Sequence, residues 1–508
     1  MTVHKVCGTE TEYGISVRNQ RESNPAIASG LVVNSYAGTH ARVQWSFEEE
    51  SPGRDARGFG VGGVVVEDFD SALVNVVLSN GARLYVDHAH PEYSTPECFD
   101  PLEAALHDKA GELVMARAGA AAGTLLPAGQ RMGLYKNNSD GKGNSYGTHE
   151  NYLLARELPF ADVIRYLTAF LVTRQIFTGS GKVGSENGRP NIPFQLTQRA
   201  DFFEERVGLE TTLKRPIINT RDEPHGDPSK YRRLHVIIGD ANLSETQTFV
   251  KLGTASLFLA ALEDGALPDP VALADPVAAV WQVSHDLDFR LPLSLEDGGS
   301  ATSLELQWQY LEWLTKYAEQ VAPDPVYDRV LALWASILAD LETDPTRLAD
   351  RLDWAAKLQI LEGFRNRDGL EWDDSKLRAL DLQYHDVDPE RGLYYRLAGR
   401  GSMQRLFTDE EIELAVAEPP ERTRAYFRGR CVSRFSESLV AANWDSLVFE
   451  VGEDTLKRVP MMEPLRGTKE RVDTVLEEVA DAAELVRALG GSHGRTGSEE
   501  GPAEGNGS

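Results

Sequence analysis

The sequence is poor in cysteine and lacks long apolar runs. Its three cysteines, Cys7, Cys98 and Cys431, lie far apart and show no metal-type pairing, which favours a reducing compartment without a disulfide framework. No apolar run approaches the roughly 20 residues of a membrane span. Residues 1–20 carry charges throughout and contain no apolar signal-peptide region. We therefore expect a cytoplasmic protein without a membrane segment.

Positive charge is also scarce. Lys and Arg number 52 against 79 Asp and Glu, which gives a formal net charge of −27. Such a chain is a poor candidate for general binding to nucleic acid or anionic membranes, so any anionic ligand must meet a local cluster of Arg or Lys. The 508 residues exceed the size at which a single core stops growing, so we expect two domains or one large domain with extensions.

Residues 80–93 contain a short predicted strand with an unusual face. Because successive side chains of a strand point to opposite sides, one face is apolar, whereas the other carries a cation, a phenol and a carboxylate in a row: Arg83, Tyr85 and Asp87. We expect a bend at His90–Pro91, with Glu92 after it. Taken alone, the stretch reads most simply as an edge strand with a solvated polar face.

Other stretches repeat this pattern. In residues 6–17, Glu10 and Glu12 share a face, and two carboxylates at this spacing suit a divalent cation. A glycine- and amide-rich loop leads to His149, and residues 231–242 place Arg233 and His235 on one face. Polar alternation also occurs in two further predicted strands, residues 194–199 and 217–225. The repetition favours an α+β fold in which an antiparallel sheet presents a polar ligand-binding trough.

Helices are predicted at residues 101–122 and 160–177, and three further predicted helices, at 245–263, 303–321 and 326–341, can cover the apolar side of this sheet. We assign residues 1–430 to one large domain, with a mobile loop at about 45–65 and a helix beginning at Asp68. Residues 431–489 form a predicted small C-terminal domain that closes with a helix at 469–489. Residues 490–508 are rich in Gly, Ser and Glu, which predicts a disordered tail.

Taken together, these stretches resemble the family of Pup deamidases, also called depupylases. The resemblance extends to about residue 489 and rests on long contiguous motifs: Gly8–Gly14, Asn80–Tyr93, Lys136–Tyr152, Ile217–His225 and Tyr231–Asn242. This family is a sister of the Pup ligases within the glutamine-synthetase-like carboxylate-amine ligases. Three features favour the deamidase: Thr9 and Tyr13 in the first motif, the link from Asp87 to Glu92, and the charged insertion at 51–59.

The resemblance implies a glutamine-synthetase-like domain with a curved sheet backed by helices, plus a small C-terminal domain. It implies ATP (or ADP with phosphate) and Mg²⁺ as cofactors, and two imidazoles among the ligands keep Mn²⁺ open. The implied partners are Pup and pupylated proteins, with a functional link to the bacterial proteasome and a monomeric enzyme. The implied reactions are isopeptide hydrolysis between the terminal Glu side chain of Pup and a target Lys, and deamidation of a terminal Gln.

Residue roles follow from the same resemblance. Asp87 is the implied catalytic residue, which either attacks the carbonyl directly or deprotonates water, and we favour direct attack. The implied metal ligands are Glu10, Tyr85, Glu92, His149 and His235, with contact through water an equal alternative for Tyr85. The implied nucleotide or phosphate contacts are Arg83, Thr95, Arg199, Arg221 and Trp444. For Trp444 the alternative is packing in the core of the small C-terminal domain.

Two other functions remain to be weighed. A Pup–protein ligase, or a related carboxylate-amine ligase, would activate a carboxylate as an acyl phosphate and consume ATP in every cycle. A catalytically inactive, nucleotide-dependent Pup-binding adaptor would have lost some of the charged trough residues. The complete set of carboxylates and histidines argues against the adaptor.

Overall fold

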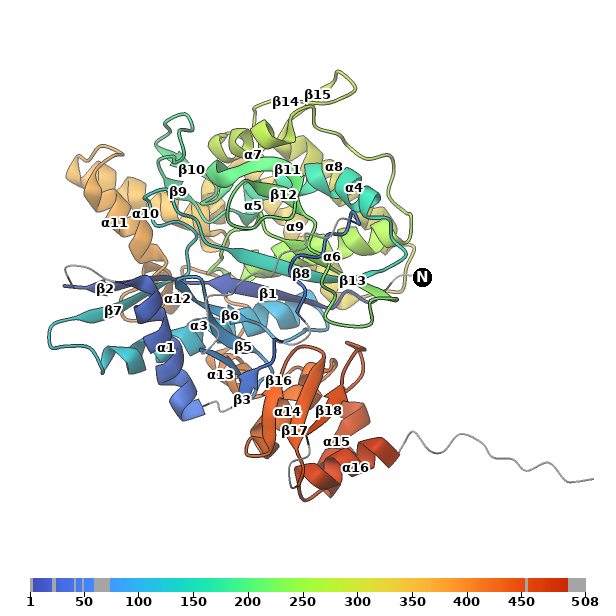
Figure 1. The fold of residues 1–508 in the computed structure, drawn as a ribbon. Helices are drawn as coiled ribbons and strands as arrows, with labels where there is room; N and C mark the ends of the chain where they lie inside the picture. Colours follow the sequence, from blue (N-terminus) through green and yellow to red (C-terminus); the bar gives the residue numbers. More distant parts are fainter. Residues whose placement is uncertain are drawn as a thin grey trace, which may run out of the picture.

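A computed structural model describes residues 3–20, 24–40, 43–47, 50–58, 74–452 and 456–491. Its centre is a ten-stranded sheet in the order β13-β8-β1-β6-β5-β4-β3-β16-β17-β18 (Figure 1), antiparallel throughout except for the parallel pair β3–β16. The strands of this sheet are β1 (Cys7–Glu12), β3 (Val43–Trp45), β4 (Asn75–Val77), β5 (Arg83–Asp87), β6 (His90–Ser94), β8 (Thr148–Ala155), β13 (Tyr231–Val236), β16 (Leu439–Ala442), β17 (Ser446–Glu450) and β18 (Leu456–Pro460).

Four two-stranded sheets accompany it. They pair β2 (Gly14–Arg18) with β7 (Arg131–Tyr135), β9 (Lys182–Val183) with β10 (Phe194–Gln195), β11 (Phe203–Gly208) with β12 (Arg215–Asn219), and β14 (Leu293–Ser294) with β15 (Ser300–Ala301). The pair β11–β12 is parallel. The predicted strand at 217–225 therefore lies beside the central sheet and is not one of its members.

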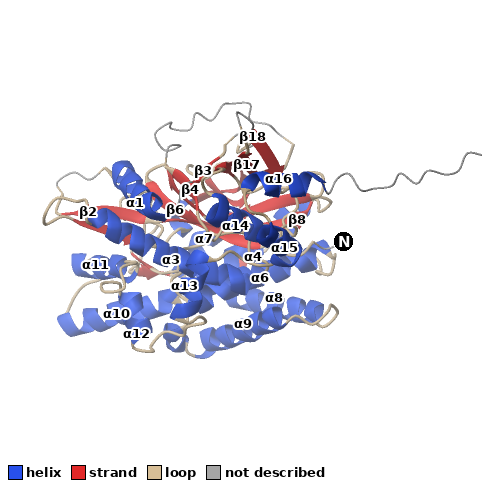
Figure 2. Ribbon diagram, turned by 90° about the horizontal axis from the view of Figure 1, so that it is seen from below, coloured by secondary structure: helices blue, strands red, loops and turns tan. Residues whose placement is uncertain are grey.

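Helices lie mostly on one side of the strands (Figure 2). They are α1 (Pro25–His40), α3 (Pro101–Gly123), α4 (Phe160–Thr173), α5 (Gln175–Thr178), α6 (Glu245–Glu263), α7 (Pro276–His285), α8 (Ser303–Ala318), α9 (Pro325–Thr343), α10 (Asp353–Asp368), α11 (Ser375–Tyr384), α12 (Leu393–Gly399), α13 (Asp409–Ala417), α14 (Ala425–Phe435), α15 (Lys469–Glu478) and α16 (Ala482–Gly491). The predicted helix at 469–489 is thus two helices, because the chain is extended at Val479.

Side-chain alternation divides the sheet into a core face and a polar face, as predicted. On β5, Leu84 and Val86 are buried in the hydrophobic core. On β6, the ring of Tyr93 packs against α3, where a Cβ on Gly111 would come within 2.3 Å of it. The polar residues of both strands therefore point away from the helices, and this leaves the opposite face free for a ligand.

Three local predictions were wrong. The turn between β5 and β6 lies at His88–Ala89, where His88 takes a left-handed backbone with φ 52°, and Pro91 is inside β6. Residues 75–77 form a strand where a helix was expected; most of that predicted helix, up to residue 73, lies outside the described residues. The strand predicted at 194–199 ends after two residues, and Arg199 precedes a 3₁₀ turn.

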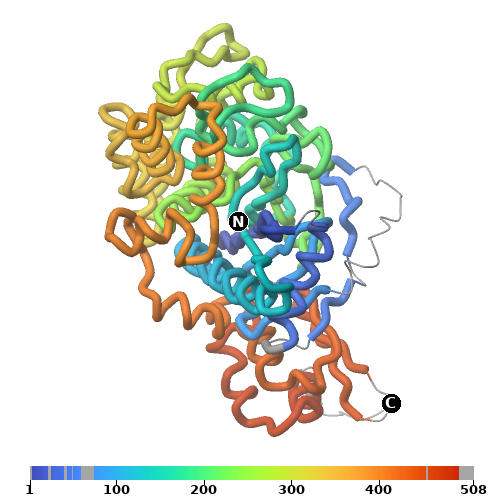
Figure 3. Tube along the Cα trace, turned by 90° about the vertical axis from the view of Figure 1, so that its left-hand side faces the viewer, coloured from blue at the N-terminus to red at the C-terminus, as the bar shows by residue number. Residues whose placement is uncertain are grey.

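The C-terminal segment completes the central sheet. Its strand β16 pairs in parallel with β3, Ala441 opposite Gln44, and its core includes Val43 and Trp45 from the N-terminal part. In Figure 3 the first strands lie between the middle of the chain and this last segment. Helix α14 crosses residue 430, and the domain division there stays a prediction.

Part of the predicted loop at 45–65 and nearly all of the predicted tail at 490–508 lie outside the described residues. The described piece, residues 50–58, is tied to the end of β12. The Asp55 carboxylate accepts a hydrogen bond from Thr220 Oγ1 at 2.8 Å, and Asp222 N donates to Arg54 O at 2.8 Å. In the part of the chain that the structure describes, no helix has the length and apolar content to cross a membrane.

Candidate active site

Strand register brings the polar residues together. On five neighbouring strands, from β13 to β5, these residues occupy matching positions. Glu10 lies directly opposite His149, and Glu12 lies opposite Glu92. Glu92 in turn faces Tyr85 across the β5–β6 hairpin. Directly opposed side chains of an antiparallel pair lie within contact distance, so two clusters form side by side on the polar face.

The first cluster consists of Glu10, His149 and His235, whose candidate ligand atoms all lie within 4.8 Å of one another. His149 Nδ1 is 3.5 Å from Glu10 Oε2, and Arg233 Nη1 is 3.2 Å from Glu10 Oε1. Burial alone would raise the pKa of Glu10, but these neighbours and His235 outweigh it and hold the pKa well below its usual range. Glu10 is therefore a carboxylate at neutral pH.

His235 presents a buried, unpartnered ring nitrogen to this cluster. Asn151 donates through Nδ2 to Glu10 Oε1 at 3.0 Å, which turns its Oδ1 toward His235 Nδ1, also at 3.0 Å. Arg233 Nη1 also lies 3.3 Å from His235 Nδ1. Burial lowers the pKa of His235 well below its usual value, which keeps the ring neutral. Nε2 is buried without a hydrogen-bond partner among the described residues. Such a neutral imidazole with an unpartnered nitrogen suits a metal ion.

The second cluster consists of Glu12, Asp87 and Glu92. Burial, followed by the charges of Asp87 and Glu12, raises the pKa of Glu92 well above its usual value. Glu12 Oε1 accepts a hydrogen bond from Gly147 N at 2.8 Å. Three carboxylates at this separation repel one another, so the cluster suits a hard divalent cation that neutralises them.

Asp87 differs from its two neighbours in exposure. Its side chain is 42% exposed, and His88 Nδ1 lies 3.0 Å from its Oδ1. Burial alone would raise the pKa of Asp87, but the hydrogen bond and charge of His88 outweigh it and lower the pKa. Asp87 in turn raises the pKa of His88 to about 9. The arrangement supplies an ionised carboxylate that faces solvent.

Asp87 lines a cavity of about 650 Å³. One wall is the turn of the β5–β6 hairpin, and the others are residues 143–147 and the connection from β11 to β12. Glu12 lies in the same cavity, as do Arg199 and Arg215. This space is where a carbonyl group could reach Asp87.

Arg83 is enclosed by aromatic rings. Its guanidinium lies 4.1 Å from the Trp45 ring centroid and 3.9 Å from that of Tyr85, and Nε donates to Asn75 Oδ1 at 2.9 Å. Such stacking fixes the plane of the guanidinium group. The carboxylate of Glu50 is more distant, with Oε1 3.8 Å from Arg83 Nη1. Arg83 can therefore hold an anionic group in a set orientation.

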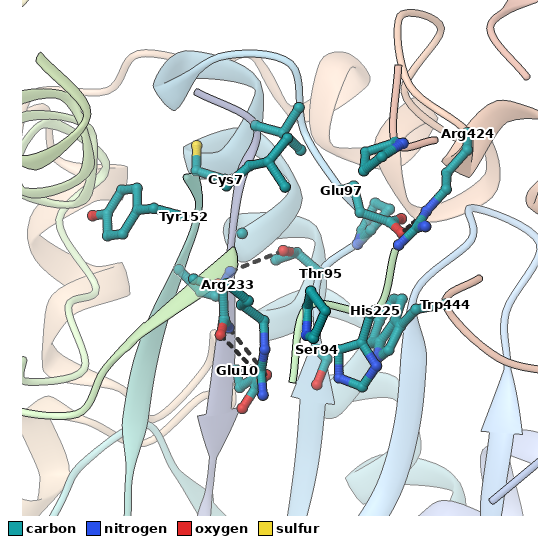
Figure 4. A pocket seen from close by; sticks show the side chains of 18 residues that line it. Cys7, Glu10, Ser94, Thr95, Glu97, Tyr152, His225, Arg233, Arg424 and Trp444 are labelled. Atoms are coloured by element: carbon teal, nitrogen blue, oxygen red, sulfur yellow. Dashed lines mark hydrogen bonds and ion pairs between the residues drawn. The ribbon is translucent and has the colours of Figure 1, made fainter. Parts of the chain in front are cut away.

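A second, smaller cavity of about 90 Å³ contains Thr95 and Trp444 (Figure 4). Thr95 Oγ1 accepts a hydrogen bond from Thr9 N at 3.0 Å, and a Cβ on Gly8 would come within 2.7 Å of it. The Trp444 ring meets Trp45 edge-on, with centroids 5.0 Å apart. The cavity therefore lies where the C-terminal segment meets β1 and β6, and its aromatic wall suits a planar base.

Glu97 also lines this cavity and links the N-terminal part of the chain to the C-terminal segment. It forms ion pairs with Arg424, at 2.7 Å, and with Arg428. Burial alone would raise the pKa of Glu97, but the two guanidinium groups outweigh it and lower the pKa to about 2. In Figure 4, Glu97 and Arg424 point toward each other, near His225 and Trp444.

Arg221 lies beside the clusters. It follows β12 and bridges to Asp55 through the backbone, and its Nε is buried without a hydrogen-bond partner among the described residues. Its charge acts on both His88 and His235. The residues that the sequence indicated are thus divided between two cavities: Asp87, His149 and Arg199 line the larger one, whereas Glu10, Thr95 and Trp444 line the smaller one.

The structure adds residues that the sequence analysis did not assign. The sequence analysis placed Glu12 on the same strand face as Glu10 but did not assign it as a metal ligand. Its position two residues after Glu10 was the signal for that role. Asn151 orients both Glu10 and His235, and its position opposite His235 follows only from strand register. Glu97 and Arg424 could not be paired from sequence because they lie more than 300 residues apart.

Comparison with known proteins shows the family to which this chain is similar. The family model described as Pup-ligase protein matches residues 5–448. The depupylase of Acidothermus cellulolyticus is 54% identical over 96% of this chain and all of its own length. The Pup deamidase/depupylase of Mycolicibacterium smegmatis is 51% identical with the same coverage.

Two solved structures share the fold. The complex of the ubiquitin-like protein Pup with its ligase PafA has a TM-score of 0.79 and 30% identity, and the match covers 99% of each chain. The ligase PafA bound to ADP has a TM-score of 0.73 and 35% identity over 79% of this chain and 89% of its own. The predicted α+β class, a sheet backed by helices, is confirmed.

Proposed function

Because the chain belongs to the Pup-ligase protein family, we propose that it is a depupylase and Pup deamidase. It hydrolyses the isopeptide bond between the C-terminal glutamate side chain of Pup and a substrate lysine, and it converts a C-terminal glutamine of Pup to glutamate. The observation that carries this proposal is the 54% identity to a depupylase over nearly the whole chain. The ligase is the alternative, and the relatives with that name are more distant, at about 40% identity.

Nucleotide binding is the first step that the geometry supports. The cavity between Trp444 and Thr95 accepts the base, and the polar face leads from it to the two acidic clusters. Arg83, held between two rings, and Arg221 can contact phosphate oxygens, because a guanidinium offers parallel donors to phosphate. The ADP complex of a family member supports a nucleotide in this fold.

Both acidic clusters fit divalent cations. His235 Nε2 has no other partner among the described residues, and Glu12, Asp87 and Glu92 need a counter-charge. Glu10, His149 and His235 would hold one ion, and Glu12 with Glu92 would hold another, with Tyr85 beside it. When bound, Mg²⁺ or Mn²⁺ would orient the nucleotide phosphates and offset the carboxylate charges.

Asp87 carries the proposed chemistry. Its carboxylate is ionised and faces the cavity, so one oxygen can attack the side-chain carbonyl of the terminal residue of Pup. The new C–O bond forms as the C–N bond breaks, and the departing nitrogen takes up a proton to leave as an amine or ammonia. Water then attacks the resulting anhydride, which releases the glutamate side chain and restores Asp87. Activation of water by the same carboxylate is the alternative route.

One incubation distinguishes hydrolase from ligase. The protein is mixed with ATP, Mg²⁺ and Pup that ends in glutamine, and ammonia and ADP are both measured. We expect many equivalents of ammonia without stoichiometric ADP. Steady ADP formation together with growth of Pup conjugates would instead establish the ligase.

A further inference from the structure

We propose that Gln198 and His385 are positioning residues of the active site, which hold Gly147 in place between the two acidic clusters. This inference rests on the proposed function and goes beyond it, because neither residue lines the cavity that contains Asp87 or the cavity that contains Thr95. It starts from a buried histidine that the proposed reaction does not use.

His385 follows α11 directly and is 1% exposed. Its Nδ1 is 2.8 Å from the carbonyl oxygen of Lys136. A carbonyl oxygen only accepts hydrogen bonds, so Nδ1 carries the proton and Nε2 is the acceptor. Two donors face this acceptor, Gln198 Nε2 at 2.7 Å and Lys357 Nζ at 2.6 Å. Burial, followed by the charge of Lys357, lowers the pKa of His385 well below its usual value, which keeps the ring neutral.

The amide group of Gln198 has one orientation that satisfies its neighbours. Its Oε1 accepts a hydrogen bond from the backbone N–H of Asn138 at 2.6 Å, which turns its Nε2 toward His385. Backbone groups therefore fix the direction of the hydrogen bonds at both ends, the carbonyl of Lys136 and the N–H of Asn138. Without the acceptor on His385, Gln198 would hold a buried donor that lacks this partner, which is costly. We expect Gln198 and Asn138 to shift together when that acceptor is lost.

Asn138 closes the loop that follows it. Its Nδ2 donates to the carbonyl oxygen of Tyr146 at 3.2 Å and to Thr148 Oγ1 at 3.3 Å. Its own carbonyl oxygen accepts a hydrogen bond from Tyr146 N at 3.3 Å. Asn138 is thus bonded to the residue on either side of Gly147, and a shift of Asn138 moves that glycine.

Gly147 contacts a residue of each acidic cluster. Its N–H donates to Glu12 Oε1 at 2.8 Å, and its carbonyl oxygen accepts from Glu12 N at 3.0 Å. A Cβ at this position would come within 2.2 Å of His149 Nε2 and 2.9 Å of Glu12 Oε1. His149 belongs to the first cluster and Glu12 to the second. A displacement of Gly147 therefore disturbs both clusters, and a misplacement of about 1 Å can cost about 100-fold in rate.

Structural support alone is the other role that this network could have. Lys357 also donates to Asp381 Oδ1 at 2.6 Å and to the carbonyl oxygen of Gly181 at 2.8 Å. The network therefore joins α10 and α11 to the segment before β9. A purely structural network would lower stability when it is broken but leave kcat intact in the protein that stays folded. A positioning network would change kcat in folded protein.

Two substitutions of His385 test the direction of the hydrogen bonds. Gln can place an acceptor oxygen near the position of Nε2, whereas the shorter Asn reaches only the position of Nδ1. The protein is supplied with ATP, Mg²⁺ and Pup that ends in glutamine, and ammonia is measured. We expect His385→Asn to lower kcat about 10- to 100-fold while KM for Pup stays within about twofold. His385→Gln, which keeps the acceptor, should retain kcat within about fivefold.

Gln198→Met and Gln307→Met form a matched pair of variant and control. Both glutamines are buried, and each donates a hydrogen bond through its side-chain amide. Gln307 lies on α8, binds Thr173 of α4 and lines neither cavity. We expect both variants to have a lower melting temperature. Only Gln198→Met should also lower kcat, by about 10- to 100-fold.

Hydrogen exchange of residues 138–148 measures the positioning without reference to the reaction. We expect the amides of Tyr146 and Gly147 to exchange faster in His385→Asn and in Gln198→Met than in the unaltered protein. Their exchange should be unchanged in Gln307→Met.

Several outcomes would overturn the inference. One is an equal kcat in His385→Asn and His385→Gln. Another is full kcat in a Gln198→Met protein that has lost as much stability as Gln307→Met, and a third is unchanged exchange of the loop in the variants. If one of the two disruptive variants does not fold, the other decides. Absence of ammonia release by the unaltered protein would reject the proposed function, and the exchange measurement would still decide whether this network holds the loop.

Discussion

At the residue scale, environment separates the two carboxylates of the β5–β6 hairpin. Glu92 is buried, and its pKa is raised well above the usual value, whereas the pKa of the half-exposed Asp87 is lowered by His88. Two carboxyl groups in one cluster can then take different roles. In the proposed reaction the ionised Asp87 would be the reactive group, and a bound cation would favour the charged form of Glu92.

Asp87→Asn tests the catalytic role. The amide is similar in size but is a poor nucleophile and base, so we expect isopeptide cleavage to fall by at least about 10³-fold. Nucleotide affinity, measured by calorimetry, should change little, because Glu10 and Arg83 remain. Asp297→Asn, in the exposed turn between β14 and β15, is the control. Substantial turnover by highly purified Asp87→Asn would remove Asp87 from the reaction.

At the element scale, one ion-pair set joins the sheet to helix α14. Glu97 follows β6 and binds Arg424 and Arg428, and its folded-state pKa of about 2 lies below the usual 4.5. A carboxylate with a lowered pKa stabilises the folded state fully above its unfolded pKa and loses this contribution as the pH falls toward the folded value.

Glu97→Gln should therefore lower the free energy of unfolding at pH 7 by about 3 kcal/mol. The difference between the two proteins should shrink between pH 5 and pH 3, because the unaltered protein loses its contribution in that window. Urea unfolding at several pH values measures it. A difference that stays constant over that range would show that the ion pairs do not carry the effect.

Two helical glycines provide a matched pair. A Cβ on Gly111 of α3 would come within 2.3 Å of the Tyr93 ring, whereas a Cβ on Gly363 of α10 would meet nothing within 4 Å. Alanine gains about 1 kcal/mol of helix propensity at either site, but overpacking a core costs about 1–3 kcal/mol.

We expect Gly111→Ala to lower the melting temperature and Gly363→Ala to raise it, both recorded by calorimetry. A stabilised Gly111→Ala would mean that the Tyr93 ring moves at little cost. The packing of the Tyr93 ring against α3 would then not be rigid.

Many of the strands and helices could be predicted from sequence, because each depends on residues that are close together in the chain. Period-two alternation indicated β1, β5 and β13, and it also identified their polar faces. The start of β6 was misplaced because proline usually marks a turn, yet here the left-handed backbone of His88 makes the turn and Pro91 is part of β6. The long final helix was predicted because apolar spacing continues across Val479, where the chain is extended.

At the scale of the whole molecule, the site depends on groups that are distant in sequence. Strand register decides that Asn151 lies opposite His235. The pairing of β3 with β16 brings Trp444, which follows β16, to Trp45. No local pattern predicts such pairs, so the family resemblance, rather than periodicity, indicated Trp444.

Removal of divalent metal tests the assembled site. After dialysis against a chelator, we expect nucleotide affinity to fall at least about tenfold and cleavage to stop, since two carboxylate clusters would face the phosphates uncompensated. Mg²⁺ or Mn²⁺ should restore both, and nucleotide with metal should raise the melting temperature. Glu10→Gln should reproduce the loss of affinity. Unchanged nucleotide affinity without metal would reject the metal-site assignment.

The parallel pairing of β3 with β16 also sets the order of events during synthesis. Gln44 leaves the ribosome long before Ala441, its partner across the strands. At typical rates of translation the delay is roughly 20 to 80 s. Throughout that time the edge of β3 is available to other chains, and the wall that Trp444 contributes does not exist. We therefore expect this edge to need protection in the nascent protein, and we expect nucleotide binding only when the chain is nearly complete.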